Sequence, residues 1–288
     1  MDACGFCGQP IARSASRCQH CARPGRFPNV LEASDPDECD ALAKRYESAV
    51  AKVPTEAKGR LGELNDLMNK TRVVISRPQS ILEQLSNADN VVYATYHQLA
   101  ESGVVLAVDD DWDRPRQIAD ITLFTNYHRE VRFGALSTDG TGLPHYGDFS
   151  MELREDFIAH RTSVLEENAV KFLDKRAGNL LDPKTRVPRG FRAPWATRSQ
   201  VGIAKLADQL KADTSTDDIA KLILIPGPDS ARDEFIEAHV FGPITRRTIG
   251  RVAFTGIRSK GRSTREKYVI LKGLQKRLEN VGIDVQGF

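Results

Sequence analysis

The feature that most constrains the fold is a pair of Cys-x-x-Cys motifs within the first 21 residues. Cys4 and Cys7 form the first motif, and Cys18 and Cys21 form the second. Two such motifs can present four thiolates in the tetrahedral arrangement of a structural zinc site. The alternative, two disulfide bonds, requires an oxidising compartment that nothing else in the sequence indicates. We therefore expect Zn²⁺ to hold this segment together as a structural cofactor.

Residues 1–26 resemble the short zinc ribbons that open many bacterial proteins. Such ribbons serve nucleic-acid binding, protein docking and folding alike, so the resemblance names no partner. We expect a linker from Phe27 to Pro36, because no apolar periodicity marks this stretch. Apolar residues then recur at helical spacing near 42–53 and 61–68, which predicts two amphipathic helices. The expected organisation is a zinc ribbon at 1–26, a linker and helical segment at 27–70, and a catalytic domain at 71–288.

Composition indicates a globular chain. Of the 288 residues, 40% are hydrophobic and 28% are charged. No apolar run approaches the roughly 20 residues that a spanning helix needs, and cysteines stand where the apolar part of a signal peptide would lie. We expect a cytoplasmic protein with no membrane partner. Eleven basic residues and one acid, Glu266, lie between Ile244 and Leu278, a block that suits a polyanion.

The segment FIEAHVFGPIT, residues 235–245, alternates as a strand does. This alternation places Glu237 and His239 on one face, framed by Phe235 and Phe241. Such a face can be the wall of a cleft or the solvated side of an antiparallel sheet, and the alternation alone leaves both open.

Other segments predict the remaining strands and turns. Residues 72–77 form a short apolar strand that ends at Arg77, just before a proline that can open a helix. Residues 131–136 and 147–153 are expected to form a β-hairpin or a close relative, since Asp139-Gly140 between them favours a turn. Ser163 and Glu166 have the spacing of a helix cap, and residues 221–225 are typical of a buried strand.

Taken in order, several of these segments resemble ADP-ribosyltransferase-like families of bacteria: RVVIS with Arg77, then FGAL, HYGDFSMEL, RTSVLEEN and FIEAHVFGPIT. Members carry an arginine or histidine at the end of the first strand and a late (V/I)EAQVHGPV segment. The resemblance spans about residues 72–256. It implies an α+β, ADP-ribosyltransferase-like split β-sandwich with helices, with NAD as substrate. Glu237 then matches the catalytic glutamate and Arg77 the first-strand residue, while His239 departs from the family's glutamine.

The chemistry of NAD suggests further contacts. Its pyrophosphate needs a bidentate cation, for which Arg77 is the first candidate and Arg132 the second. Its nicotinamide needs a flat apolar partner and backbone hydrogen bonds. Candidates for these contacts are Tyr93, Tyr146, Phe133 and Gly134, with Ser137 either orienting this wall or serving a plain turn.

The sequence thus predicts a glycosyltransferase, an NAD-dependent ADP-ribosyltransferase toxin of a toxin–antitoxin or phage-defence system. The basic block favours a nucleic acid as acceptor, RNA ahead of DNA, and the toxin role implies an antitoxin or chaperone as a partner. The alternative is a non-enzymatic, zinc-ribbon nucleic-acid-binding protein in which Glu237 is an ordinary strand residue.

Overall fold

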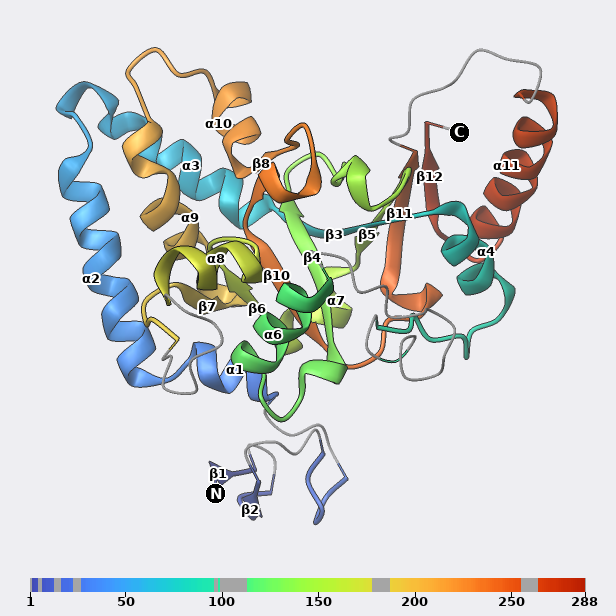
Figure 1. Cartoon of the computed structure of the whole chain (residues 1–288), viewed down its shortest axis with the longest axis horizontal. Helices are drawn as coiled ribbons and strands as arrows, with labels where there is room; N and C mark the ends of the chain where they lie inside the picture. The colour runs from blue at the N-terminus through green and yellow to red at the C-terminus, as the bar shows by residue number, and fades with distance from the viewer. Residues whose placement is uncertain are drawn as a thin grey trace.

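An eight-stranded mixed sheet is the framework of the computed structural model, which describes residues 2–4, 7–12, 17–22, 27–95, 98, 113–177, 187–254 and 264–287 (Figure 1). The strand order is β12-β11-β5-β3-β4-β10-β6-β7, and only β11 and β12 pair in parallel. Sheet and helices together confirm the α+β class. The strands of this sheet are β3 (Arg72–Arg77), β4 (Val131–Ser137), β5 (Phe149–Leu153), β6 (Thr162–Leu165), β7 (Arg192–Pro194), β10 (Glu237–Phe241), β11 (Ile249–Phe254) and β12 (Asp284–Gln286). Two small ribbons pair β1 (Asp2–Ala3) with β2 (Pro10–Ile11) and β8 (Leu224–Ile225) with β9 (Glu234–Phe235).

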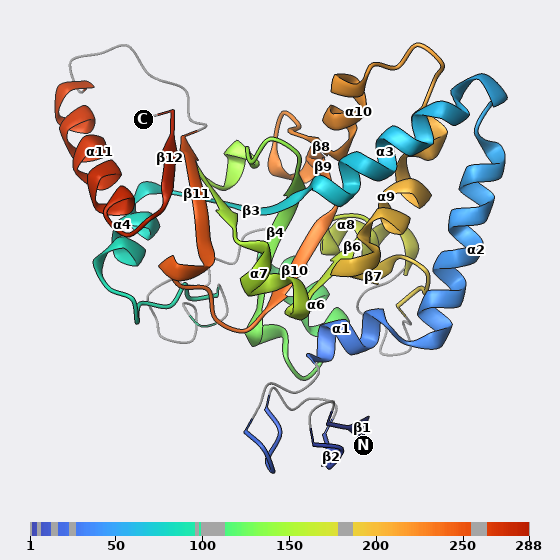
Figure 2. The ribbon, with the colours of Figure 1, turned by 180° about the vertical axis from the view of Figure 1, so that it is seen from behind.

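Helices gather at the two ends of the sheet, as Figures 1 and 2 show from opposite sides. One end carries α2 (Pro36–Lys52), α3 (Lys58–Lys70), α9 (Arg198–Leu206) and α10 (Thr216–Ile223). The other end carries α4 (Gln79–Asn87) and α11 (Thr264–Glu279). Within the described ranges, no helix combines the length and hydropathy needed to cross a membrane. Shorter or more central helices are α1 (Pro28–Ala33), α6 (Asp113–Leu123), α7 (Glu155–Ile158) and α8 (Ala169–Arg176).

Strand β3 divides the sheet, because its two halves pair with different neighbours. Arg72 to Val74 pair with β4, whereas Val74 to Arg77 pair with β5. Beyond Val74, β3 and β4 therefore have no shared register, and β4 continues only along β10. Gly134 permits this crossing, since a Cβ there would lie 2.8 Å from the carbonyl oxygen of Val74. The divergence opens a space between the ends of β3 and β4.

The expected hairpin of residues 131–136 and 147–153 is wrong, although both strands exist. Strand β3 lies between β4 and β5, so the two strands do not pair with each other. Their connection makes a turn at Asp139–Gly140, with Gly140 at φ 80°, and a 3-10 turn at Pro144–Tyr146. Local turn signals therefore located the bend correctly, but strand pairing depended on a partner far away in the sequence.

Three other local predictions need correction. Residues 27–36, expected to be a linker, contain helix α1, and its Asn29 is 2% exposed. The Asn29 amide donates to the carbonyl oxygens of Arg161 and His239 at 3.2 and 2.8 Å, which anchors α1 to the sheet. Ser163 lies in β6, and Asn168 rather than Ser163 caps the following helix, α8. In the segment 221–225, helix α10 continues to Ile223, so only two residues are extended.

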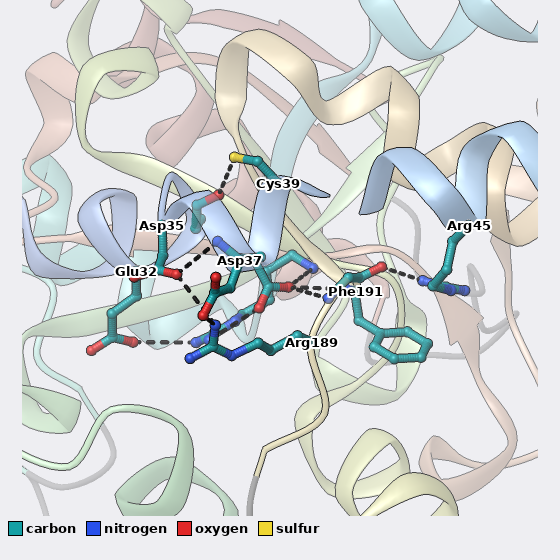
Figure 3. A network of polar contacts seen from close by, with 11 residues as sticks. Glu32, Asp35, Asp37, Cys39, Arg45, Arg189 and Phe191 are labelled. Atoms are coloured by element: carbon teal, nitrogen blue, oxygen red, sulfur yellow. Dashed lines mark hydrogen bonds and ion pairs between the residues drawn. The ribbon is translucent and has the colours of Figure 1, made fainter. Parts of the chain in front are cut away.

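The helical segment before β3 is built into the main body of the protein. Buried Leu42, Leu64 and Met68 belong to the same hydrophobic cluster as Val201 and Ile203 of α9. Figure 3 shows the polar contacts that join the start of α2 to the chain around residue 190. Their centre is Glu38, 1% exposed, whose Oε1 accepts the backbone N–H groups of residues 190–192 at 2.9–3.0 Å. Arg45 adds a hydrogen bond of 2.6 Å to the Gly190 carbonyl oxygen.

Candidate functional site

The four predicted zinc ligands lie together. The sulfur atoms of Cys4, Cys7, Cys18 and Cys21 all fall within 4.8 Å of one another. Sγ of Cys4 is 3.7 Å from Sγ of Cys21, and Sγ of Cys7 is 3.6 Å from Sγ of Cys18. A tetrahedral site with Zn–S bonds of about 2.3 Å has sulfur–sulfur edges of about 3.8 Å. The cluster therefore fits a metal ion such as Zn²⁺.

The two knuckles of the cluster repeat one backbone geometry. Gly8 follows the second cysteine of its motif and Ala22 follows the second cysteine of the other, and both have positive φ, 71° and 55°. Each donates its N–H to the carbonyl oxygen of the first cysteine in its motif, Cys4 or Cys18, at 2.9 Å. The backbone N–H of His20 lies 3.4 Å from Sγ of Cys18. The four sulfur atoms thus face one another, with Cys4 and Cys18 buried and Cys7 exposed.

A cavity of about 280 Å³ lies where β3 and β4 diverge. It receives side chains from β3, β4, β9 and β10 and from helix α6. Seven residues proposed from the sequence line it, while Ser137 does not. Instead, the Ser137 hydroxyl accepts the Gly140 N–H at 3.1 Å and donates to Asp139 at 2.9 Å, the contacts of a turn. The seven lining residues are Arg77, Tyr93, Arg132, Phe133, Gly134, Tyr146 and Glu237.

The face that carries Glu237 and His239 is buried, so its interpretation as a solvated sheet face is wrong. Glu237 is 2% exposed and His239 is not exposed at all. The His239 ring packs edge-on against Phe124 and Phe133, with centroids 4.7 and 5.5 Å away. Its Nε2–H donates to Oε2 of Glu237 at 3.1 Å, and among the described residues its buried Nδ1 has no partner. Nε2 is the donor in this pair, because an ionised carboxylate can only accept a hydrogen bond.

Four groups hold the Glu237 carboxylate. Oε2 accepts the backbone N–H of Ala169, at the start of α8, at 2.9 Å, besides the bond from His239. Oε1 lies 3.3 Å from Nη1 of Arg116 and 3.5 Å from Nδ2 of Asn168. Burial acts to raise the pKa of Glu237, but Arg116, His239 and the Ala169 N–H together hold this pKa below its ordinary value. The side chain is therefore an ionised carboxylate inside the protein.

Arg116 and Asp120 on α6 are site residues that the sequence reasoning missed. Nε of Arg116 lies 3.0 Å from Oδ1 of Asp120, and the guanidinium Cζ lies 4.0 Å from the Phe133 ring centroid. Burial acts to lower the pKa of Arg116, but Asp120 and Glu237 raise it overall, so its charge is secure. The i, i+4 spacing of an arginine and an aspartate was the only local signal. It could not reveal that the pair faces Glu237, more than a hundred residues later.

The two candidate arginines, Arg77 and Arg132, differ in which of their guanidinium nitrogens are already hydrogen-bonded within the protein. Arg132 is 3% exposed; its Nη1 binds the Glu130 carbonyl oxygen, and its Nη2 contacts Tyr93 O and Gln98 Oε1 at 3.4 and 3.3 Å. Arg77 is half-buried; its Nε donates to the Tyr93 hydroxyl and its Nη1 to Ser76 O. In the described part of the chain, Nη2 of Arg77 has no bonded partner. Arg77 is thus the better placed to bind an anion, and Arg132 serves to hold the segment at Tyr93.

Tyr146 supplies a neutral hydroxyl to the cavity. Burial raises the pKa of Tyr146 to about 12, with Arg116 and Arg77 lowering it and Glu237 raising it. These influences place the phenol within the electrostatic field of the two arginines and the carboxylate. The group can therefore donate a hydrogen bond at neutral pH as well as offer its ring face.

Three arginines in the described part of the basic block pair with acids of the same chain. Arg246 and Arg247 both bind Asp89, and Arg251 lies 2.5 Å from Glu152. The central residues of the block, Arg258, Lys260 and Arg262, lie outside the described residues.

Comparison with protein-family models and with curated proteins finds no match to this chain.

Proposed function

We propose that the chain is an NAD-dependent ADP-ribosyltransferase in which Glu237 is the catalytic carboxylate. The observation that carries the proposal is the charge around this residue. Arg116 is the one arginine in contact with Glu237 among the described residues, and it is shared with Asp120. Within this cluster two carboxylates face one guanidinium, while the other arginines that line the cavity, Arg77 on β3 and Arg132 on β4, belong to different strands. An excess of negative charge next to Glu237 favours a transition state that becomes positive there.

NAD cleavage has such a transition state. The bond between the nicotinamide nitrogen and the ribose C1′ breaks, its electron pair leaves with nicotinamide, and the ribose becomes an oxocarbenium ion. The acceptor's nucleophile then bonds to C1′ and gives up its proton. Glu237 stabilises the oxocarbenium charge and can accept that proton. The buried Ala169 N–H and His239 fix Oε2, so the carboxylate needs no reorganisation during the step.

The cavity suits one half of the dinucleotide. At about 280 Å³ it is at the small end of ligand sites, which fits the nicotinamide riboside portion rather than the whole molecule. Phe133, Tyr93 and Tyr146 provide aromatic surface for the pyridine ring. The unpaired Nη2 of Arg77 is then the group we assign to the pyrophosphate. Under this proposal the chain has the split β-sandwich that the family resemblance implies, and the ligand lies where β3 and β4 diverge.

The test is incubation of the purified chain with NAD labelled in its adenylate phosphate, together with RNA, DNA or cell lysate. We expect nicotinamide release and transfer of the label with the wild-type chain, and neither with Glu237→Gln. If Glu237→Gln folds and transfers label at the wild-type rate, the assignment is wrong. Loss of cellular toxicity on the same substitution would support the role as a toxin of a toxin–antitoxin or phage-defence system, kept in check by an antitoxin or chaperone.

For the acceptor we propose nucleic acid, RNA ahead of DNA, because eleven basic residues follow Ile244. Electrostatic binding to single strands weakens with salt at a slope of about −0.7 per phosphate contacted. Replacing Arg258, Lys260 and Arg262 by glutamine should lower both RNA affinity and that slope, while NAD hydrolysis without acceptor continues. Label that goes only to protein and survives nuclease treatment would exclude nucleic acid as the acceptor.

The four-cysteine cluster favours the second candidate, a non-enzymatic zinc-ribbon protein that binds nucleic acid. Under either function we expect about one zinc per chain, from the four-ligand stoichiometry. Cys18→Ala combined with Cys21→Ala should abolish zinc binding, as measured by metal analysis. If this double variant still hydrolyses NAD, the two parts of the chain have separate roles. If the wild-type chain binds RNA but never consumes NAD, the second candidate replaces the first.

A further inference from the structure

The two oxygens of Glu237 are held unequally. Oε2 receives two bonds from rigid parts of the fold, the Ala169 N–H at 2.9 Å and His239 Nε2 at 3.1 Å. Oε1 receives only the longer contacts from Arg116 and Asn168, at 3.3 and 3.5 Å. Oε1 is therefore the oxygen that a ligand can engage with the least loss of existing bonds.

Arg116 is itself held without help from Glu237. Its Nε lies 3.0 Å from Asp120, one turn later on α6, and its guanidinium lies over the Phe133 ring at 4.0 Å. Its side chain is 16% exposed and lines the cavity. A guanidinium fixed at one edge and across one face presents its remaining edge in a defined direction.

We propose that Arg116 is a positioning residue that directs Oε1 of Glu237 at the ligand, and that Asp120 in turn holds Arg116 in place. The inference rests on the proposed function, since it adds to the role of Glu237. It assigns a part in the site to α6, which none of the motifs that carry the family resemblance includes.

Among the groups that face Glu237, Arg116 has the largest influence in favour of the ionised carboxylate. Asp120 on α6 adds negative charge, Tyr146 is neutral, and His239 on the same strand and the Ala169 N–H of α8 contribute hydrogen bonds. Burial acts to raise the pKa of Glu237, and the charge of Arg116 is the largest influence against it. Without that charge, burial would raise the pKa, and the carboxylate would be lost at a higher pH than in the wild-type protein.

The experiment measures nicotinamide release from NAD as a function of pH for Arg116→Gln and Arg116→Lys. For Arg116→Gln we expect kcat to fall on the order of 10²-fold, the scale of a misplaced catalytic group. KM for NAD should change little, and the acid limb of the pH profile should move to higher pH. Arg116→Lys retains the charge but replaces the planar guanidinium, which contacts Asp120 through Nε and Glu237 through Nη1, by a single ammonium group. It should therefore lower kcat and leave the acid limb near that of the wild type.

The matched control is Arg176→Gln. Arg176 also pairs with a buried glutamate, Glu166, and lies over an aromatic ring, Phe191, but it does not line the cavity. We expect its pH profile and kcat to match those of the wild type. An Arg116→Gln variant with wild-type kcat and acid limb, alongside an inactive Glu237→Gln, overturns this inference and leaves the proposed function standing.

An active Glu237→Gln instead overturns the proposed function itself. If Arg116→Gln does not fold, Arg116→Lys and Asp120→Asn decide the question. Asp120→Asn loosens Arg116 without removing its charge, so we expect a smaller loss of kcat, on the order of tenfold. Wild-type kcat in both variants would refute the positioning role.

Discussion

Glu237 and Glu166 are buried to the same depth, each 2% exposed, but their surroundings differ in charge and in access to the cavity. Glu166 binds two arginines, Arg45 at 2.6 Å and Arg176 at 2.5 Å. These guanidiniums lie over Phe191, with Cζ atoms 3.7 and 4.3 Å from the ring centroid. Among the described residues, Glu237 pairs with a single arginine, Arg116, which it shares with Asp120.

The difference shows that burial and ion pairing by themselves do not identify a catalytic carboxylate. The Glu166 cluster carries an excess of positive charge and does not line the cavity, so its function is to join α2 and α8 to the chain near residue 191. The Glu237 cluster carries an excess of negative charge at a cavity wall. What distinguishes the Glu237 cluster is therefore the sign of its excess charge and its place at the cavity, where a ligand can meet that charge.

The largest expected effect is on activity. Glu237→Gln should lower the rate of NAD cleavage on the order of 10²-fold or more, because it removes one preorganised electrostatic partner. Its stability should fall by less than the roughly 3–5 kcal/mol typical of breaking a buried ion pair, since Arg116 keeps Asp120 as a partner. Nicotinamide release and thermal unfolding measure the two quantities. If Glu237→Gln is destabilised but cleaves NAD at the wild-type rate, Glu237 has the structural role that we assign to Glu166.

Glu166→Gln should show the opposite pattern. Removing this carboxylate leaves two guanidiniums uncompensated, but both are partly exposed, Arg45 at 26% and Arg176 at 37%, and can be rehydrated. We therefore expect a loss of about 2 kcal/mol, below the full cost of breaking a fully buried pair. Denaturant unfolding measures it, and the folded fraction should cleave NAD at the wild-type rate. Lost activity in folded Glu166→Gln would mean that the two clusters share one function.

The smallest expected effect is on the pH dependence of stability. The pKa of Glu237 is lower in the folded protein than its ordinary value. Its ionisation therefore stabilises the fold above the unfolded pKa of about 4.3, and this contribution is lost as pH falls through the folded pKa. Thermal unfolding followed through this acidic range should show a shallower decline for Glu237→Gln than for the wild type. Parallel declines would indicate that folding does not lower the pKa of Glu237.

Several parts of the protein were predictable because their signals are local. The cysteine cluster depends on spacings within the first 21 residues, and helices α2 and α3 follow apolar periodicities of their own segments. Strands β3 and β10 likewise appear where short apolar or alternating runs predicted them. Local signals also misled, since residues 27–36 showed no periodicity and yet form α1, which is held by Asn29 on distant carbonyl groups.

By itself, then, the sequence determined the four-cysteine segment, because its ligands follow from residue type and nearby spacing. The α+β class and seven of the residues that line the cavity followed from the family resemblance and the chemistry of NAD. Only the tertiary structure decided that β3 separates β4 from β5, that both Nη atoms of Arg132 are bonded while Nη2 of Arg77 has no partner in the described part of the chain, and that Arg116 meets Glu237. These outcomes depend on strand pairing and helix packing between segments far apart in the chain. The free energy of such contacts comes from all the partners at once, so no local pattern encodes it.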